Sequence, residues 1–268
     1  MKKKTDRKAG ATLSNFYIAV IFIFLYIPIF SVILFSFNTS KLNIVFEGFT
    51  LQWYGSFFQN RTLMESLYNT LVIAVTSTVI STVIGTVGAV GFSKYEFRGR
   101  KLIDMLLYVP IVIPEIVLGV AMLCVFSIVN IPLGLMAMTF GHVTFCIPFV
   151  VISVRARLAG YDKNLEEASM DLGANRFRTF TEVTLPLIMP GIVSGATLSL
   201  SLSLDDVVIS FFCSGPGSMT LPLKILEMVK HGVSPDVNAL STIITLVIVT
   251  AISMNTWTQI RKMRRTEC

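Results

Sequence analysis

The chain has 268 residues, of which 53% are hydrophobic and only 14% charged, and its formal net charge is +6. So large an apolar share, with a mean hydropathy of +0.73, exceeds what a soluble domain of this length needs for its core, and it excludes that class. The positive charge does not indicate nucleic-acid binding, because the basic residues lie at the ends of apolar runs and form no single basic face.

Long uncharged runs predict an all-α polytopic membrane protein with six transmembrane helices. A helical span needs about 20 residues. The run 116–154 is long enough for most of two spans, and Asn130-Ile131-Pro132-Leu133-Gly134 is a turn signal in its middle. The expected spans are about 16–37, 68–92, 104–128, 133–154, 187–212 and 237–259.

The distribution of basic residues predicts the orientation. Six spans put both tails, 1–15 and 260–268, on the same side of the membrane. Of the 22 Lys and Arg residues, 18 fall on that side, and the positive-inside rule makes it cytoplasmic.

The N-terminal lysines and the apolar run that follows them also resemble a secretory signal. That run is too long for such a signal and no clear small-x-small cleavage site follows it, so we expect a retained first span.

Two segments are expected on the opposite side of the membrane. Residues 38–66 are rich in aromatic side chains, which are typical either of the belt at the lipid headgroups or of a docking surface. Residues 213–236 contain a Gly-Pro-Gly turn and a short helix that ends near His231. Ser234 is expected to cap the last span, with Pro235 in its first turn.

Three carboxylates are expected at membrane depth. Glu115 follows Pro110 and Pro114 in the third span, and Asp205 and Asp206 lie together in the outer half of the fifth. No Lys or Arg lies within any expected span, so these groups must be protonated, hydrated in a cavity, or paired with a cation from outside the chain.

Polar residues follow the fifth span in two adjoining stripes. One consists of Ser194, Thr197, Ser201 and Asp205, and the other of Ser199, Ser203, Asp206 and Ser210. Helical spacing places both on one broad side of the helix, which predicts a hydrated wall; alternatively, the hydroxyls hydrogen-bond between helices. Negative charge along such a wall selects for cations. The candidate substrate-path residues are Glu115, Ser201, Ser203, Asp205 and Asp206.

The cysteines and histidines predict no cofactor or metal site. No pair of the four cysteines has metal-ligand spacing, and we interpret them as small packing residues. His142 lies inside the fourth span, where a polar side chain bonded to a neighbouring helix is the simpler interpretation and a proton relay the other.

A polar segment between the fourth and fifth spans predicts a compact knob at the membrane surface. Asp162 can cap a short helix over about 163–172, Glu166 and Glu167 place negative charge in its first turn, and Gly173 provides a left-handed stop. Asn175 then opens a second short helical stretch, and the next membrane helix begins at Pro186. Such a knob suits docking into a groove on a partner protein.

The same segment resembles the coupling loop of binding-protein-dependent ABC importer permeases. The family pattern is Glu-Ala-Ala, three residues, Gly, nine residues, Ile-x-Leu-Pro. Here Glu167, Ala168, Gly173, Leu185 and Pro186 match it, whereas Ser169 and Val183 are small departures. The resemblance implies a type I ABC importer permease fold, with a core domain over about 66–259, and a cytoplasmic coupling helix in the loop 160–186 that docks on an ATPase subunit. The alternative is an ordinary amphipathic loop.

Further segments carry a second resemblance: 92–99, 114–116, 142–150, 204–212, 215–217, 221–225 and 232–240. They are similar to the spermidine/putrescine importer permeases, and to the second of their two permease subunits. The resemblance implies that the chain translocates polyamines across the bacterial inner membrane. It also implies three kinds of partner: a dimer of ATP-binding subunits, a second homologous permease subunit, and an extracytoplasmic polyamine-binding protein.

The chain is not expected to be an enzyme, because it has no Gly-x4-Gly-Lys-Ser/Thr phosphate loop, so ATP hydrolysis would belong to a partner. Two alternatives stay open for the solute: a permease for another cationic or small organic compound, and a cation-coupled secondary transporter. The latter would usually show internal repeats, which this sequence lacks. An intramembrane hydrolase is disfavoured, since adjacent Asp205 and Asp206 point about 100° apart on a helix.

Overall fold

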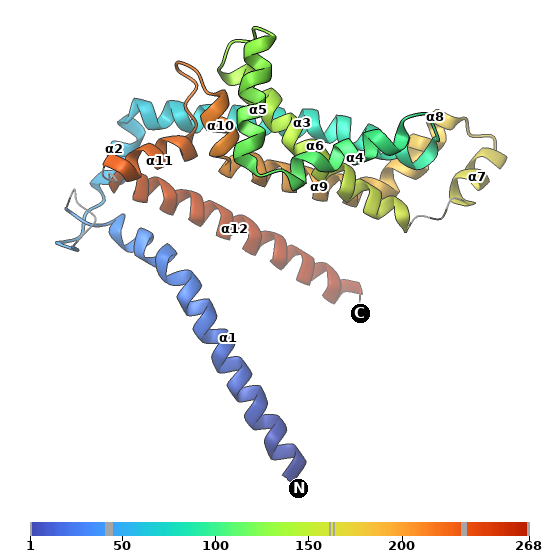
Figure 1. Ribbon diagram of the computed structural model, residues 1–268. Helices are drawn as coiled ribbons and strands as arrows, with labels where there is room; N and C mark the ends of the chain where they lie inside the picture. Colours follow the sequence, from blue (N-terminus) through green and yellow to red (C-terminus); the bar gives the residue numbers. More distant parts are fainter. Residues whose placement is uncertain (1, 41–44, 161, 163, 232–234, 267–268) are drawn as a thin grey trace. The chain divides into compact units, whose positions relative to one another are not determined.

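The computed structural model describes residues 2–40, 45–160, 162, 164–231 and 235–266 (Figure 1). Within these ranges the regular structure is helical, and the β-type pairing is an isolated antiparallel bridge between Asn38 and Phe49. The expected all-α class is therefore confirmed. The chain divides into two units: residues 1–64 with 227–268, and residues 65–226.

The first unit contains α1 (Lys2–Phe35), α2 (Gln52–Gln59) and α12 (Pro235–Thr266), and α12 packs against both of the others. Asp236, in the first turn of α12, accepts a hydrogen bond from the Ser56 hydroxyl at 2.6 Å. Trp53, also in α2, donates from Nε1 to the carbonyl of Asn38 at 2.6 Å. Pro235 begins α12 as expected, whereas the expected cap Ser234 lies outside the described residues.

The second unit is built around α6 and α9, which pack along each other; α4 packs on α6, and α5 on α10. The helices are α3 (Arg61–Lys94, which begins just before this unit), α4 (Arg100–Val112), α5 (Glu115–Ile128), α6 (Leu135–Ala159), α7 (Asn164–Asp171), α8 (Arg176–Thr179), the π-helix η1 (Phe180–Thr184), α9 (Leu185–Asp205), α10 (Val208–Cys213) and α11 (Leu221–His231, which ends beyond it).

Four helical stretches of the described residues are long and apolar enough to cross a membrane: Asn15–Phe35, Arg61–Lys94, Leu135–Ala159 and Arg176–Asp205. They contain the whole of the expected second span and most of the first, fourth and fifth. The expected sixth span, 237–259, lies in α12. The apolar stretch Pro235–Thr250 is shorter than a full span, and the complete sixth span stays a prediction.

The expected third span, 104–128, is divided. It consists of α4 and α5, and the break between them bends the chain by 114°. Ile113 has extended backbone angles, φ −72° and ψ 136°, because the residue before a proline is disfavoured in the helical region, and Pro114 also lacks an amide donor. The expected fifth span is divided as well: α9 ends at Asp205, and α10 begins at Val208.

Glycines allow the helices of the second unit to approach each other closely. A Cβ atom on Gly195 of α9 would lie 3.0 Å from the Cα of Val150 in α6, and one on Gly119 of α5 would lie 2.5 Å from the ring of Phe212 in α10. Small residues at helix contacts are the usual means of close packing in membranes. The pairs α6–α9 and α5–α10 are therefore fixed at short range, and they position the polar groups described next.

Candidate functional site

The three expected carboxylates lie at the two helix breaks. Glu115 is the first residue of α5, Asp205 is the last residue of α9, and Asp206 occupies the break that follows. Since α5 packs on α10, the two breaks lie in the same region of the second unit. Glu115 and Asp205 are exposed, whereas Asp206 is only 6% exposed.

Asp206 is not an unpaired carboxylate. Its Oδ2 accepts from the amide of Ser210 at 2.7 Å and its Oδ1 from the amide of Ile209 at 3.2 Å, which caps the first turn of α10. His142 of α6, itself 2% exposed, places Nε2 at 3.2 Å from Oδ2. The prediction that all three carboxylates lack a partner within the chain is therefore wrong for Asp206. Its partner is a histidine, and the prediction considered only Lys and Arg.

The second polar stripe of the fifth span is an interhelical hydrogen-bond network. With Nε2–H directed to Asp206, His142 Nδ1 is left to accept from the Ser203 hydroxyl at 2.6 Å. Ser203 in turn contacts the hydroxyl of Ser77 in α3 at 3.1 Å, and Ser199 contacts Ser81 at 2.9 Å. All of these side chains are buried. The Ser210 hydroxyl lies 3.2 Å from His142 Nε2. The predicted hydrated wall is therefore wrong for Ser199, Ser203, Asp206 and Ser210, and the alternative, hydroxyls bonded between helices, is confirmed for the three serines.

The first stripe has a different environment. Ser194, Thr197, Ser201 and Asp205 are exposed, and the hydroxyls of Thr197 and Ser201 donate to carbonyls of their own helix.

Two members of the network, Ser77 and Ser81, were not predicted from the sequence, because their partners lie 126 and 118 residues away. Their spacing of four residues, equal to that of Ser199 and Ser203, is the signal that could have paired the two helices.

The cysteines agree only partly with the packing interpretation. Cys146 and Cys213 are buried, and Cys124 is exposed; Cys268 lies outside the described residues. Among the described residues, no group of three or more His, Cys, Asp and Glu side chains could hold a metal ion.

The knob between the fourth and fifth spans has the expected local structure. The short helix is α7, and the Asp162 carboxylate accepts from the amide of Asn164 at 3.0 Å at its start. Gly173 has a φ of +92°, the left-handed conformation that ends the helix. Asn175 caps α8 by accepting from the amide of Arg178 at 2.8 Å. Helix caps and stops are local, so the sequence was sufficient to predict them.

The entry into the fifth span differs from expectation. It was predicted to begin at Pro186, but the helix runs on from α8 through the π-turn η1 into α9, as one stretch from Arg176 to Asp205. Pro186 lies in the first turn of α9. In the π-turn before Pro186 the backbone hydrogen bonds join residues i and i+5. This wider turn allows the proline to be accommodated without ending the helix.

The residues of the coupling pattern divide into an outer and an inner set. Glu167, Ala168, Gly173 and Pro186 are exposed, and Ser169 and Leu185 are half-buried. The Ser169 hydroxyl lies 3.3 Å from that of Thr179 in α8. Next to the outer set, Leu172 and Phe177 are 90% and 77% exposed. Apolar side chains so exposed on a polar loop are typical of a protein-binding surface.

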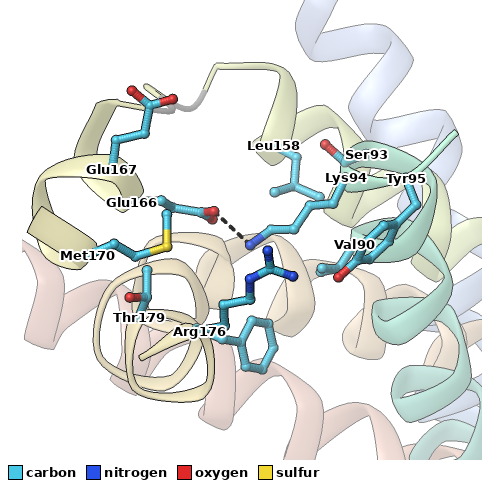
Figure 2. Close-up of a pocket in the computed structure, with 11 residues that line it drawn as sticks. Val90, Ser93, Lys94, Tyr95, Leu158, Glu166, Glu167, Met170, Arg176 and Thr179 are labelled. Carbon is cyan, nitrogen blue, oxygen red and sulfur yellow. Dashed lines mark hydrogen bonds and ion pairs between the residues drawn. The ribbon is translucent and has the colours of Figure 1, made fainter. Parts of the chain in front are cut away.

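Glu166 has a structural role that the sequence analysis missed. Its Oε2 accepts from the Lys94 ammonium at 2.7 Å, and its Oε1 accepts from the Thr184 hydroxyl at 2.6 Å. The ion pair borders a cavity of about 480 Å³ beneath α7, which α3, α6 and α8 also line (Figure 2). The sequence predicted for Glu166 only a favourable charge in the first turn of the helix.

The known proteins that are similar to this chain agree with one another. The family described as "Binding-protein-dependent transport system inner membrane component" matches residues 81–260. The spermidine/putrescine transport system permease protein PotC of Escherichia coli K12 is 43% identical over 235 residues, 88% of this chain and 89% of its own. The putrescine permease PotI of the same organism is 37% identical, covering 83% and 82%.

A solved structure shares the fold. It is a bacterial ABC transporter involved in the import of the acidic polysaccharide alginate, and it superposes with a TM-score of 0.71 over 95% of this chain and 96% of the other, at 17% identity. Identity at that level shows a shared fold alone.

The buried network predicts a strong effect of removing its histidine. His142→Leu leaves the Asp206 carboxylate and the Ser203 hydroxyl without their partner in an apolar interior, so we expect a loss of about 3 kcal/mol of stability. The measurement is the thermal unfolding midpoint of the detergent-solubilised protein. Thr144→Val, which removes an exposed hydroxyl from the same helix, is the control and should change the midpoint little. An unfolding midpoint equal to the wild type for His142→Leu would contradict the network.

Proposed function

Because the chain belongs to the family of binding-protein-dependent transport system inner membrane components, we propose that it is the permease subunit through which an ABC importer moves spermidine and putrescine. As a family member it is a multi-pass membrane transport component, and ATP hydrolysis belongs to a separate subunit. The observation that carries the choice of substrate is the 43% identity, over 88% of the chain, to a spermidine/putrescine permease.

The exposed carboxylates support a polycationic substrate. Glu115 and Asp205 lie at helix breaks of packed elements and are both exposed, so two carboxylates are offered in the same region. A polyamine carries separated ammonium groups, each of which can be attracted by one carboxylate in a partly dehydrated path. We assign Glu115, Asp205 and the exposed Ser201 to the path. Asp206 and Ser203 are assigned a supporting role, because their polar atoms are already bonded.

We expect Glu115→Gln and Asp205→Asn each to lower spermidine uptake by about tenfold at sub-saturating concentration, the effect of losing one charge-assisted contact. The measurement is ATP-dependent uptake of labelled spermidine by proteoliposomes that contain the whole complex. Thr197→Val, an uncharged change on the same exposed face of α9, is the control.

If the wild-type complex shows no ATP-dependent uptake of spermidine or putrescine, the proposed substrate is wrong. If both carboxylate variants transport normally, their place in the path is wrong.

The coupling loop supports one of three proposed kinds of partner. A dimer of ATP-binding subunits is proposed to bind the surface that contains Glu167, Ala168 and Gly173, because apolar Leu172 and Phe177 are exposed beside them. Ser169, Leu185 and Pro186 would hold that surface in position. The other proposed partners are a second, homologous permease subunit and an extracytoplasmic polyamine-binding protein, with membrane lipid around the apolar helices.

Charge reversal tests the docking surface. Glu167→Lys places a cation where the loop is proposed to enter its partner, and juxtaposed like or unpaired charges are costly in an interface. We expect ATP-dependent spermidine uptake to fall to about a tenth while the amount of protein in the membrane is unchanged. Glu96→Lys makes the same charge change at a highly exposed residue of another loop and serves as the control. Unchanged uptake in Glu167→Lys would remove this residue from the docking surface.

The proposed orientation places both termini in the cytoplasm. It is supported by the positions of 18 of the 22 Lys and Arg residues, which fall on the side of the tails and the coupling loop. A reporter enzyme that is active only outside the cytoplasm, fused after the last residue, should be inactive. Activity of that fusion would reverse the orientation.

A further inference from the structure

Glu166 connects the coupling helix to two other helices of the same unit. Lys94 is the last residue of α3, and Thr184 is the last residue of η1, directly before α9. We propose that Glu166 is a positioning residue that transmits displacement of α7 to α3 and α9, and thus couples ATP hydrolysis to solute movement. This inference rests on the proposed docking of an ATPase subunit on the loop.

The two contacts use separate carboxylate oxygens, so they act at the same time. Thr184 is fully buried, and the side chains of Lys94 and Glu166 are 31% and 18% exposed. Solvent screens a partly buried pair less than a fully exposed one. A second ion pair of the loop, between Arg178 and Glu182, is 66% and 59% exposed and lies within one continuous helical stretch. It does not connect the loop to another part of the unit, and it is a natural comparison.

The cavity under α7 explains why such a bridge matters. Close-packed interiors transmit displacement by direct contact. Here a space of about 480 Å³ lies among α3, α6, α7 and α8, so direct packing between the coupling helix and α3 is reduced. The Lys94–Glu166 pair extends across this region, as Figure 2 shows. The bridge therefore carries part of the mechanical connection that side-chain packing would otherwise supply.

Glu166 and its neighbour Glu167 have different orientations. In Figure 2 the Glu166 carboxylate points toward Lys94, whereas the Glu167 carboxylate points away from it. Successive helical residues lie about 100° apart, so one glutamate faces inward and the other outward. The outward residue belongs to the proposed docking surface and the inward residue to the connection behind it.

The contact with Thr184 reaches the substrate path. η1 joins directly to α9, which continues to Asp205 at the other end. A displacement applied at Thr184 therefore acts on the helix that bears the exposed carboxylate. Short π-turns inside helices are frequent at functional sites, where they mark a local departure from regular packing.

The test uses the complete complex in proteoliposomes, with simultaneous measurement of ATP hydrolysis and uptake of labelled spermidine. For Glu166→Gln and Lys94→Met we expect hydrolysis still to be stimulated by the loaded binding protein, while spermidine imported per ATP hydrolysed falls by about threefold or more. The reversed pair, Lys94→Glu with Glu166→Lys, should restore the ratio. The new ammonium can pair with the new carboxylate, and the Thr184 hydroxyl can accept a hydrogen bond from it.

Reversal of the comparison pair, Arg178→Glu with Glu182→Arg, is the matched control and should leave the ratio unchanged. The proposal is overturned if both single variants keep the wild-type ratio. It is equally overturned if the reversed pair imports as little spermidine per ATP hydrolysed as the single variants do. The same holds if the single variants reduce only the amount of protein in the membrane. Failure of the proposed function would instead appear in the wild-type complex, as an absence of ATP-dependent spermidine uptake.

Discussion

The carboxylate of Asp206 can be buried in a membrane helix bundle because three polar partners contact it: two backbone amides and the imidazole of His142, which in turn accepts from the Ser203 hydroxyl. An ionisable group in such an environment is costly unless it is paired. This network fixes the break between α9 and α10. It therefore also fixes where α10 begins, and α10 positions α5 through the close contact of Phe212 with Gly119.

The helix α9 joins the two regions of interest in the second unit. One end bears Asp205 beside the buried network, and the other end follows Thr184, which donates to Glu166. Between them, Gly195 brings α9 close to the backbone of α6. Because α6 also carries His142, the two helices share both a tight apolar contact and a polar connection. They form one connected pair between the loop that contains α7 and the exposed carboxylate of Asp205.

Local features were predictable from the sequence, and three-dimensional pairings were not. The Asp162 cap, the left-handed Gly173 and the Asn175 cap depend on neighbours within a few residues. The burial of Ser203 depends on which side of α9 faces α3 and α6, and periodicity alone does not specify that side. The Glu166–Lys94 pair joins residues 72 apart. The sequence predicted three carboxylates at membrane depth, but the helix breaks decide which of them are exposed.

Asp205 and Asp206 illustrate why adjacent residues of one chemical type have separate roles. The first is the last residue of a helix and remains exposed, and the second, with extended backbone angles, turns inward and caps the next helix. The Asp206 carboxylate is already bonded to two backbone amides and to His142, so its role is to hold the start of α10 in place. Of the three carboxylates, Glu115 and Asp205 are exposed, and a direct contact with the proposed solute is therefore argued for these two alone.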